Sequence, residues 1–318
     1  MPHAQATDRT GLRLGAAAYG LWGLFPLYFH QLSDIEPIQV LAHRIWWSVV
    51  VLAIVQAVRR TRASSTGDHP DPAPATAATP KQKRLAAVAG VLLASNWLIY
   101  VWAVSVDRVV EASLGYYLTP LLTVALGVGV LHEKLRPAHR VVLCLAAAGV
   151  AVLTVAAGTV PWVSLGLATT FSLYSLLKKQ VALDTFQSLW FETAPLAPLA
   201  AAALLVWAAK GTLSLGDPLT TVLLVSAGVV TAVPLLLFAA AGRRLPLVWI
   251  GLLQYLTPTL QFGLATLVYH EAVSAQRLIG FVLVWAAVVV MCVDAARSLR
   301  GPVANSAVPP LASVTPGP

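Results

Sequence analysis

GLLQYLTPTLQ, residues 251–261, contains the tetrapeptide YLTP, and the same four residues occur earlier in the chain, at positions 117–120. The two copies lie 138 residues apart, and each is followed by a His-Glu pair whose glutamate lies thirteen residues beyond the proline. A shift of 138 aligns residues 95–133 with residues 233–271 without a gap, and roughly a third of the aligned positions are identical. The chain therefore contains a diverged internal repeat.

The composition is that of a membrane protein. Apolar residues make up 58% of the 318 residues, charged residues only 11%, and the mean hydropathy is +0.76, whereas soluble domains carry about 25% charge. Apolar runs of about 20 residues, enough to cross roughly 30 Å of hydrocarbon, recur along the chain and are continuous rather than alternating. We predict an all-α polytopic membrane protein with ten transmembrane helices. The ten predicted spans are residues 11–32, 36–58, 85–106, 109–131, 138–157, 161–180, 184–208, 217–241, 245–269 and 274–294.

The net charge of +8 is distributed in a way that orients the chain. With residues 1–10 placed in the cytoplasm, seventeen Lys and Arg residues fall in cytoplasmic segments, and only Arg108, Lys210 and Arg277 fall outside. This positive-inside bias predicts a multi-pass protein of the inner or plasma membrane with both termini cytoplasmic. The basic charge thus faces membrane lipids and the cytoplasm, and we expect no nucleic-acid partner.

Two halves of five spans each follow from the repeat. We predict a first repeat over residues 11–158 and a second over residues 159–294, and because five is odd the halves enter the membrane from opposite sides. Residues 63–80 and the tail 295–318 are predicted to be a disordered cytoplasmic linker and a disordered cytoplasmic tail, since much of each is rich in Ala, Pro, Ser and Thr without an apolar period.

The paired prolines gain a mechanical meaning from the repeat. A proline inside a helix donates no hydrogen bond, so Pro120 frees the carbonyl of Tyr116 and Pro258 frees that of Gln254. Each half would then hold a helix interrupted at an equivalent depth, which is typical of transport sites. The alternative is a pair of structural kinks satisfied by neighbouring helices.

One cation and one anion are predicted near the middle of the membrane. Arg44 lies eight residues beyond Glu36, about 12 Å into the second span, and its repeat counterpart is Glu192 in the seventh. An ionised side chain at this depth costs about 2.5–3.5 kcal/mol, so it must be paired, hydrated or functional. Either the two residues line or gate a central cavity, with Glu192 a proton-coupling carboxylate, or they form a static buried ion pair.

The other candidate cavity residues are polar side chains spread over three predicted spans. They are Asn96, Tyr100, Glu111, Tyr116, Thr119, Gln254 and Gln261. As a set they predict a cavity for an amphipathic or aromatic small-molecule substrate. Singly, each could instead form an interhelical hydrogen bond worth about 0.6 kcal/mol.

The signatures of enzymes and metal sites are absent from the sequence. There is no phosphate-binding loop, no His-Glu-x-x-His and no Gly-x-Ser-x-Gly, so we expect no ATPase or hydrolase activity. Cys144 and Cys292 lie in apolar runs, and no His or Cys cluster has ligand spacing. We therefore predict a protein that is not an enzyme and that uses no metal or cofactor.

Six stretches of the sequence resemble the RarD-type members of the EamA family, within the drug/metabolite transporter superfamily. They are LWGLFPLYF (21–29), LAHRIWWS (41–48), NWLIYVWAV (96–104), EASLGYYLTP (111–120), VPLLLFAAAGRRLPL (233–247) and GLLQYLTPTLQF (251–262). The resemblance implies a ten-helix inner-membrane permease of two inverted five-helix repeats with a central cavity and no ATPase.

The resemblance also marks residues by position. Arg44, Asn96, Glu111 and Gln254 stand in motifs of the family. The sequence departs from the family pattern in two respects. Thr119 replaces the usual Asn before the proline, and His132 and His270 replace the usual Gly before the two loop glutamates.

The function predicted first is a secondary transporter of a small organic solute that works by alternating access as an exporter. The alternative is a membrane-embedded enzyme or scaffold that acts on a lipid-linked substrate through groups such as His43, Glu111 and Glu192. Such an enzyme would need its catalytic groups at one interface, but the sequence scatters them over several helices and depths.

Overall fold

The computed structural model describes residues 8–65, 79–105, 109–157, 162–268, 270 and 275–300. In this part of the chain every regular element is a helix, which confirms the predicted all-α class. The elements are α1 (Arg9–Gly23), α2 (Phe25–Phe29), η1 (His30–Leu32), α3 (Pro37–Ser65), α4 (Pro80–Ser105), α5 (Val109–Gly129), α6 (Pro137–Ala157), α7 (Trp162–Gln180), α8 (Thr185–Thr193), η2 (Ala194–Leu196), α9 (Ala197–Ala209), α10 (Pro218–Arg244), α11 (Leu247–Leu253), α12 (Leu256–Leu267) and α13 (Ala275–Arg300).

The helices begin where the local sequence favours it. α3, α4, α6 and α10 each begin at a proline, whose fixed φ and missing N–H suit the first helical position. α1 is capped by Asp8, whose carboxylate accepts hydrogen bonds from the N–H groups of Thr10 at 2.8 Å and Gly11 at 3.1 Å. Asp217 caps α10 in the same way, through the N–H of Thr220 at 2.8 Å.

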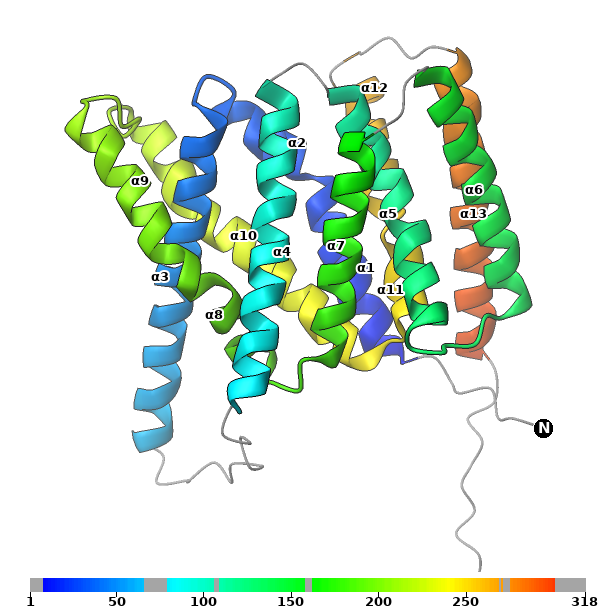
Figure 1. Ribbon diagram of the computed structural model, residues 1–318, viewed down its shortest axis with the longest axis horizontal. Coiled ribbons are helices and arrows are strands. Elements are labelled where there is room, and N and C mark those ends of the chain that lie inside the picture. The colour runs from blue at the N-terminus through cyan, green and yellow to red at the C-terminus, as the bar shows by residue number, and fades with distance from the viewer. Residues whose placement is uncertain are drawn as a thin grey trace, which may run out of the picture.

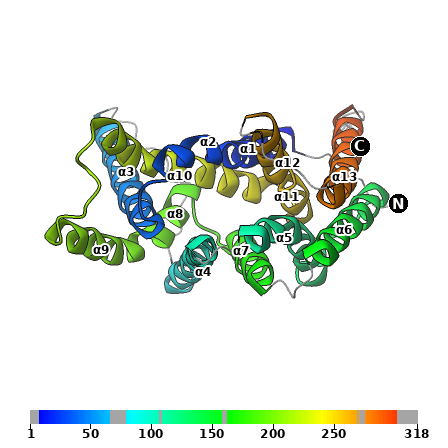
Figure 2. The same ribbon diagram turned by 90° about the horizontal axis from the view of Figure 1, so that it is seen from above.

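The helices stand in two rows (Figures 1 and 2). Seen from above, one row holds α4, α7, α5 and α6, and the other holds α3, α10, α1, α12 and α13. Each row mixes helices from early and late in the chain, and the close pairs α5–α7, α4–α7, α3–α10 and α1–α10 all join the predicted first half to the second. Helices from the two predicted halves are thus interleaved rather than placed side by side.

The helical segments follow the predicted spans, but three of those spans are divided. The first contains α1, α2 and η1, the seventh contains α8, η2 and α9, and the ninth contains α11 and α12. Among the described residues, three helical stretches are long and apolar enough to cross a membrane by themselves: Pro37–Val58, Thr185–Ala209 and Pro218–Arg244. Because of these breaks, no single helix in the first or ninth predicted span is longer than 15 residues in the described chain.

Two counterpart histidines share an unusual backbone conformation. His132 has φ 53° and His270 has φ 52°, and they are the non-glycine residues with positive φ in the described chain. This left-handed region is rarely occupied by residues with a side chain and is natural for glycine. The conformation gives a physical reason for the family's glycine at these positions.

Glu133 joins the two halves at the end of the molecule where α5 ends. Its two carboxylate oxygens accept hydrogen bonds from the N–H groups of Leu247 at 2.7 Å and Val248 at 2.8 Å, so it caps the start of α11. Its repeat counterpart, Glu271, lies outside the described residues.

The predicted linker and tail are shorter than expected. α3 continues to Ser65 and α13 to Arg300, several residues beyond the predicted ends of their spans. Residues 66–78 of the linker and 301–318 of the tail lie outside the described part of the chain.

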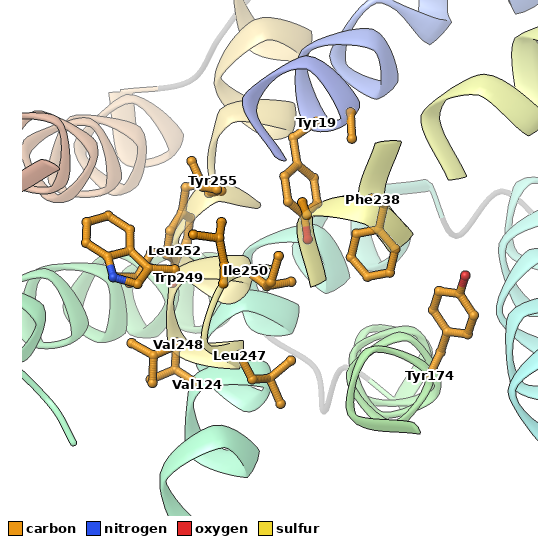
Figure 3. Packing of buried hydrophobic residues seen from close by; sticks show 14 of the residues in the cluster. Tyr19, Val124, Tyr174, Phe238, Leu247, Val248, Trp249, Ile250, Leu252 and Tyr255 are labelled. Carbon is orange, nitrogen blue, oxygen red and sulfur yellow. The ribbon is translucent and has the colours of Figure 1, made fainter. Parts of the chain in front are cut away.

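The core lies where α1, α7, α10 and α11 meet. Figure 3 shows Tyr19 directed toward Phe238, with Tyr174 on the far side of Phe238. Nearly all of α11 is buried beside them, from Leu247 to Leu253.

Candidate functional site

A cavity of about 480 Å³ lies between the two rows of helices. Its wall includes side chains from α1, α2, α3, α4, α5, α7, α10 and α12. Ser33, Pro37 and Tyr100 are the exposed residues of this wall, and the first two lie between η1 and the start of α3. Its inner end is formed by the buried residues Tyr19, Gln254 and Thr257.

Arg44 is the charged residue in this wall. Its Nε donates to Thr231 Oγ1 at 3.1 Å. The guanidinium carbon lies 4.7 Å from the ring centroid of Trp97, 4.9 Å from that of Phe29 and 5.8 Å from that of Phe25. Aromatic faces attract a cation and hold the planar guanidinium in one orientation. The structure thus places Arg44 in the wall of the cavity.

Six of the predicted polar residues lie in the same wall. They are Asn96, Tyr100, Tyr116, Thr119, Gln254 and Gln261. The seventh, Glu111, belongs to α5, but its side chain is outside the described part of the structure.

Several of these side chains also make structural contacts. Asn96 Nδ2 donates to the carbonyl of Leu167 and to Thr170 Oγ1, both at 2.9 Å, and so ties α4 to α7. Thr119 Oγ1 donates back to the carbonyl of Gly115 in its own helix at 2.6 Å. The amide of Asn96 and the hydroxyl hydrogen of Thr119 are therefore engaged within the protein.

Gln254 is different, because its side-chain oxygen is buried without a partner. Oε1 of Gln254 and the hydroxyl of Tyr19 are both inaccessible to water and accept or donate no hydrogen bond among the described residues. An unsatisfied buried polar atom costs about 1–3 kcal/mol. Both atoms belong to residues that line the inner end of the cavity.

The two prolines do not affect their helices equally. α5 is continuous through Pro120, whereas the helix before Pro258 is divided between α11 and α12 at Gln254 and Tyr255. The carbonyl of Gln254, which the sequence predicted to be free, accepts a hydrogen bond from the N–H of Thr257 at 3.2 Å. A tighter turn thus replaces the bond that proline prevents.

Glu192 lies behind the cavity and not in its wall. Its carboxylate forms a very short ion pair with Lys178 and also accepts hydrogen bonds from Ser188 at 2.7 Å and Tyr174 at 3.2 Å. The side chains of Lys178 and Glu192 are 4% and 0% exposed, so the pair is buried. The interpretation that Glu192 pairs with Arg44 is corrected: its cation is Lys178, which the charge count had placed among the cytoplasmic anchors.

An aromatic cluster separates the cavity from the Lys178–Glu192 pair. The cluster consists of Tyr19, Trp22, Phe171, Tyr174 and Phe238, with ring centroids 5.4–6.1 Å apart between contacting rings. Tyr174 stacks on Phe238 on one side and reaches Glu192 with its hydroxyl on the other. The cavity is closed at this end by packed rings.

Sequence reasoning missed the rings around Arg44 and the partner of Glu192. Nothing in the spacing of Phe25, Phe29 and Trp97 along the sequence indicates that their rings surround a guanidinium. Nothing in the sequence around Thr231 indicates that its hydroxyl accepts a hydrogen bond from Arg44. The sequence does contain one signal for the partner of Glu192: Ser188 and Glu192 are spaced one helical turn apart and so form a polar face of α8. In the structure both side chains contact the ammonium group of Lys178.

Comparison with known proteins gives a consistent family. The sequence profile of the EamA-like transporter family matches residues 9–155. The chain is 40% identical to Protein RarD of Streptomyces exfoliatus, over 93% of this chain and 92% of that one. It is 35% identical to Protein RarD of Escherichia coli (strain K12), over 92% and 97% of the two chains. It is 38% identical to an uncharacterized transporter of Vibrio cholerae, over 92% and 95%.

A solved structure shares the fold. It is a crystal structure of a protein 20% identical in sequence, and it superposes with a TM-score of 0.67 over 92% of this chain and 98% of the other. At this identity the likeness concerns the fold alone.

Proposed function

This chain belongs to the EamA-like transporter family as a RarD-type member, and we propose that it moves a small organic solute across the membrane by alternating access through the cavity between its helix rows. The cavity is the observation that carries this proposal. Its wall has exposed residues where η1 meets α3, and its inner end is closed by the aromatic cluster. A cavity with exposed lining residues at one end and packed rings at the other fits one state of an alternating-access transporter.

The proposed architecture is ten membrane helices in two inverted five-helix repeats. Counterpart helices support this, because they run in opposite directions in Figure 1: α5 descends while α11 and α12 ascend, and α3 descends while α8 and α9 ascend. The shared left-handed conformation of His132 and His270 supports the same alignment.

We place the protein in the inner or plasma membrane with both termini in the cytoplasm. The excess of Lys and Arg at the end of the molecule that holds Arg243 and Arg244 supports this orientation. The cavity then opens to the outside, and the aromatic cluster is the inner gate. We assign the direction as export, so that this state is the one that releases solute.

Glu192 is our candidate for proton coupling, acting together with Lys178. Protonation of the carboxylate would remove the ion pair with Lys178 and weaken the contact with Tyr174, which belongs to the inner gate. Proton binding would thereby loosen the packed rings and favour opening toward the cytoplasm. In this proposal the coupling proton binds at the Lys178–Glu192 pair, on the far side of the aromatic cluster from the cavity that holds the solute.

Liposomes that contain only the purified protein test the transport function. The proposal predicts protein-dependent counterflow of solutes found by screening expressing cells against drugs, amino acids and other metabolites. Gln261→Trp, which places a large ring in the cavity wall, should abolish this flux. Val282→Trp on the exposed face of α13 is the matched control and should leave it unchanged. Equal flux in the two variants would remove the cavity from the transport path.

A further inference from the structure

Arg44 has free donors that point to an anionic ligand. A guanidinium carries five N–H groups, and here Nε–H is taken by Thr231. Among the described residues no acceptor binds Nη1 or Nη2, and the rings of Phe29 and Trp97 contact the group through their faces. The two terminal nitrogens together form the fork that matches a carboxylate.

Among the described residues of the cavity wall, Arg44 has no carboxylate counterion. In the described part of the wall there is no Asp, Glu, Lys or His, so Arg44 sets the sign of the site. Lys178, by contrast, is buried and is paired with Glu192 inside the protein. Arg44 is only partly buried, in the cavity wall. A charge at this depth without a counterion is usually functional. Among the described residues, the protein thus neutralises Lys178 and leaves Arg44 available to an anion that enters the cavity.

The other side chains of the wall indicate the size and polarity of the ligand. The aromatic rings of Trp22, Tyr100, Tyr116 and Phe171 surround the space, and about 480 Å³ falls within the usual range for small-molecule sites. Aromatic and aliphatic groups bind well in such a wall. The ligand therefore has an apolar or aromatic body of moderate size.

The inner end of the cavity contains a hydrogen-bond acceptor without a partner among the described residues. Oε1 of Gln254 is buried and unpaired, and Gln254 as a whole is 6% exposed. A ligand N–H or O–H would satisfy this oxygen, and an apolar ligand would leave it unpaired. The same atom then discriminates between ligands of equal charge.

We propose that the solute is an organic monoanion, a carboxylate with an aromatic or apolar body and an N–H or O–H donor, whose carboxylate pairs with Arg44; this deepens, and rests on, the transport function proposed above. The anion binds the Nη groups of Arg44, its body lies among the rings, and its donor faces Gln254. Cations are excluded because the site is positive, and neutral amides lose the charge-assisted hydrogen bonds.

The probes are three phenylalanine derivatives of nearly the same shape. N-acetylphenylalanine is an anion with an N–H donor, N-acetylphenylalaninamide is its neutral counterpart, and phenylalaninamide is a cation. Binding is measured by the shift of thermal unfolding in detergent. Counterflow in liposomes is measured separately. The acid should bind roughly 10- to 150-fold more tightly than the neutral amide, as expected for a charged hydrogen bond, and the cation more weakly still.

The variants separate the charge from the fold. Arg44→Gln should lower affinity for the acid by the same factor and remove its preference over the amide. Arg44→Lys, which keeps the charge but loses the fork, should recover part of it. Arg140→Gln removes an exposed cation of α6 and should change nothing. If Arg44→Gln is unstable, two measurements still test the anion assignment. One compares the acid with the amide on the unaltered protein, and the other measures the affinity of Arg44→Lys for the acid.

The outcomes distinguish this inference from the transport function. Binding of the amide or the cation as tightly as the acid, no binding of the acid, or full affinity in Arg44→Gln would overturn the assignment of an anion. Flux of other solutes in the same liposomes would then leave the transport function standing. Arg44-dependent binding of the acid supports the anion assignment, and an absence of all flux beside it would count against transport alone.

Discussion

Gly90 and Gly228 occupy the same position of the repeat, 138 residues apart, and each is the point where a helix of one half touches the backbone of the other half. A β-carbon on Gly90 would lie 2.2 Å from the carbonyl oxygen of Glu192, and one on Gly228 would lie 2.3 Å from the carbonyl carbon of Trp47. Glu192 is the counterpart of Arg44, and Trp47 lies one helical turn beyond Arg44. The two crossings therefore hold the two charged residues in place.

Alanine at either crossing should destabilise the protein. Gly90→Ala and Gly228→Ala each force backbone against backbone, and overpacking of this kind costs about 1–3 kcal/mol. Thermal unfolding in detergent measures the effect. Gly20→Ala in α1 is the matched control, since no atom lies within 4 Å of its added carbon. Unfolding temperatures equal to that of the control would show that the helices are less closely packed than described.

Removal of the Glu133 carboxylate should loosen the start of α11. Glu133→Ala leaves the N–H groups of Leu247 and Val248 without acceptors, and loss of a helix cap costs about 0.5–2 kcal/mol. Glu133→Gln keeps one acceptor and should lose less. The same unfolding assay measures this order. An equal loss from Lys134→Ala, which alters an exposed neighbour, would mean that the loop matters and the cap does not.

The Lys178–Glu192 pair should behave as a coupled unit. Lys178→Met or Glu192→Gln alone leaves one buried group without its partner, and breaking such a pair costs about 3–5 kcal/mol. The double variant should lose less than the sum of the two, which a double-mutant cycle measures. The exposed Asp8–Arg244 pair, at 3.1 Å, is the comparison and should show little coupling. Additive losses at Lys178 and Glu192 would contradict the pairing.

Proton coupling makes a separate demand on Glu192. If the carboxylate takes up the coupling proton, Glu192→Gln should retain counterflow at equal pH on the two sides and lose accumulation driven by a pH gradient. Flux assays in the same batch of liposomes provide the two measurements. Full gradient-driven accumulation in Glu192→Gln would exclude this residue as the coupling group.

Pro258→Ala should impair transport more than Pro120→Ala. An alanine at 258 supplies the N–H that can bond to the carbonyl of Gln254 and join α11 to α12, which would shift Gln254 relative to Gln261. α5 is already continuous at Pro120, so Pro120→Ala should alter the path of its helix less than Pro258→Ala alters that of α11 and α12. Initial rates of counterflow measure the difference. Equal rates in the two variants would remove the proposed role of the break.

The repeat explains how much the sequence could predict. The apolar runs located most of the helical segments, although α3 continues seven residues beyond its predicted span, and the shift of 138 pairs His132 with His270, which share a conformation. The same reasoning assigned equal breaks to two equal prolines. It was wrong there, because the path of a helix at proline depends on which neighbours accept and donate the remaining bonds, and those neighbours come from distant parts of the chain.

Side-chain partners were the least predictable feature. Arg44 and Glu192 are equivalent in the repeat, yet one lies against three aromatic rings and the other against Lys178. A sequence can indicate that a buried charge matters, but its partner follows only from the packing of helices.

Access to one cavity residue from each side of the membrane tests the central claim most directly. Leu93 lines the cavity and is 2% exposed. In a variant with Cys144 and Cys292 replaced by alanine, Leu93→Cys should react with an impermeant maleimide from either side. Because Leu93 is nearly inaccessible in this state, Gln261→Cys, at a partly exposed residue of the cavity wall, is the second reporter and should also react from either side. Ser33→Cys at the opening should react from outside only, and Lys134→Cys from inside only. Reaction of Gln261→Cys from a single side, in protein that still carries solute, would contradict alternating access.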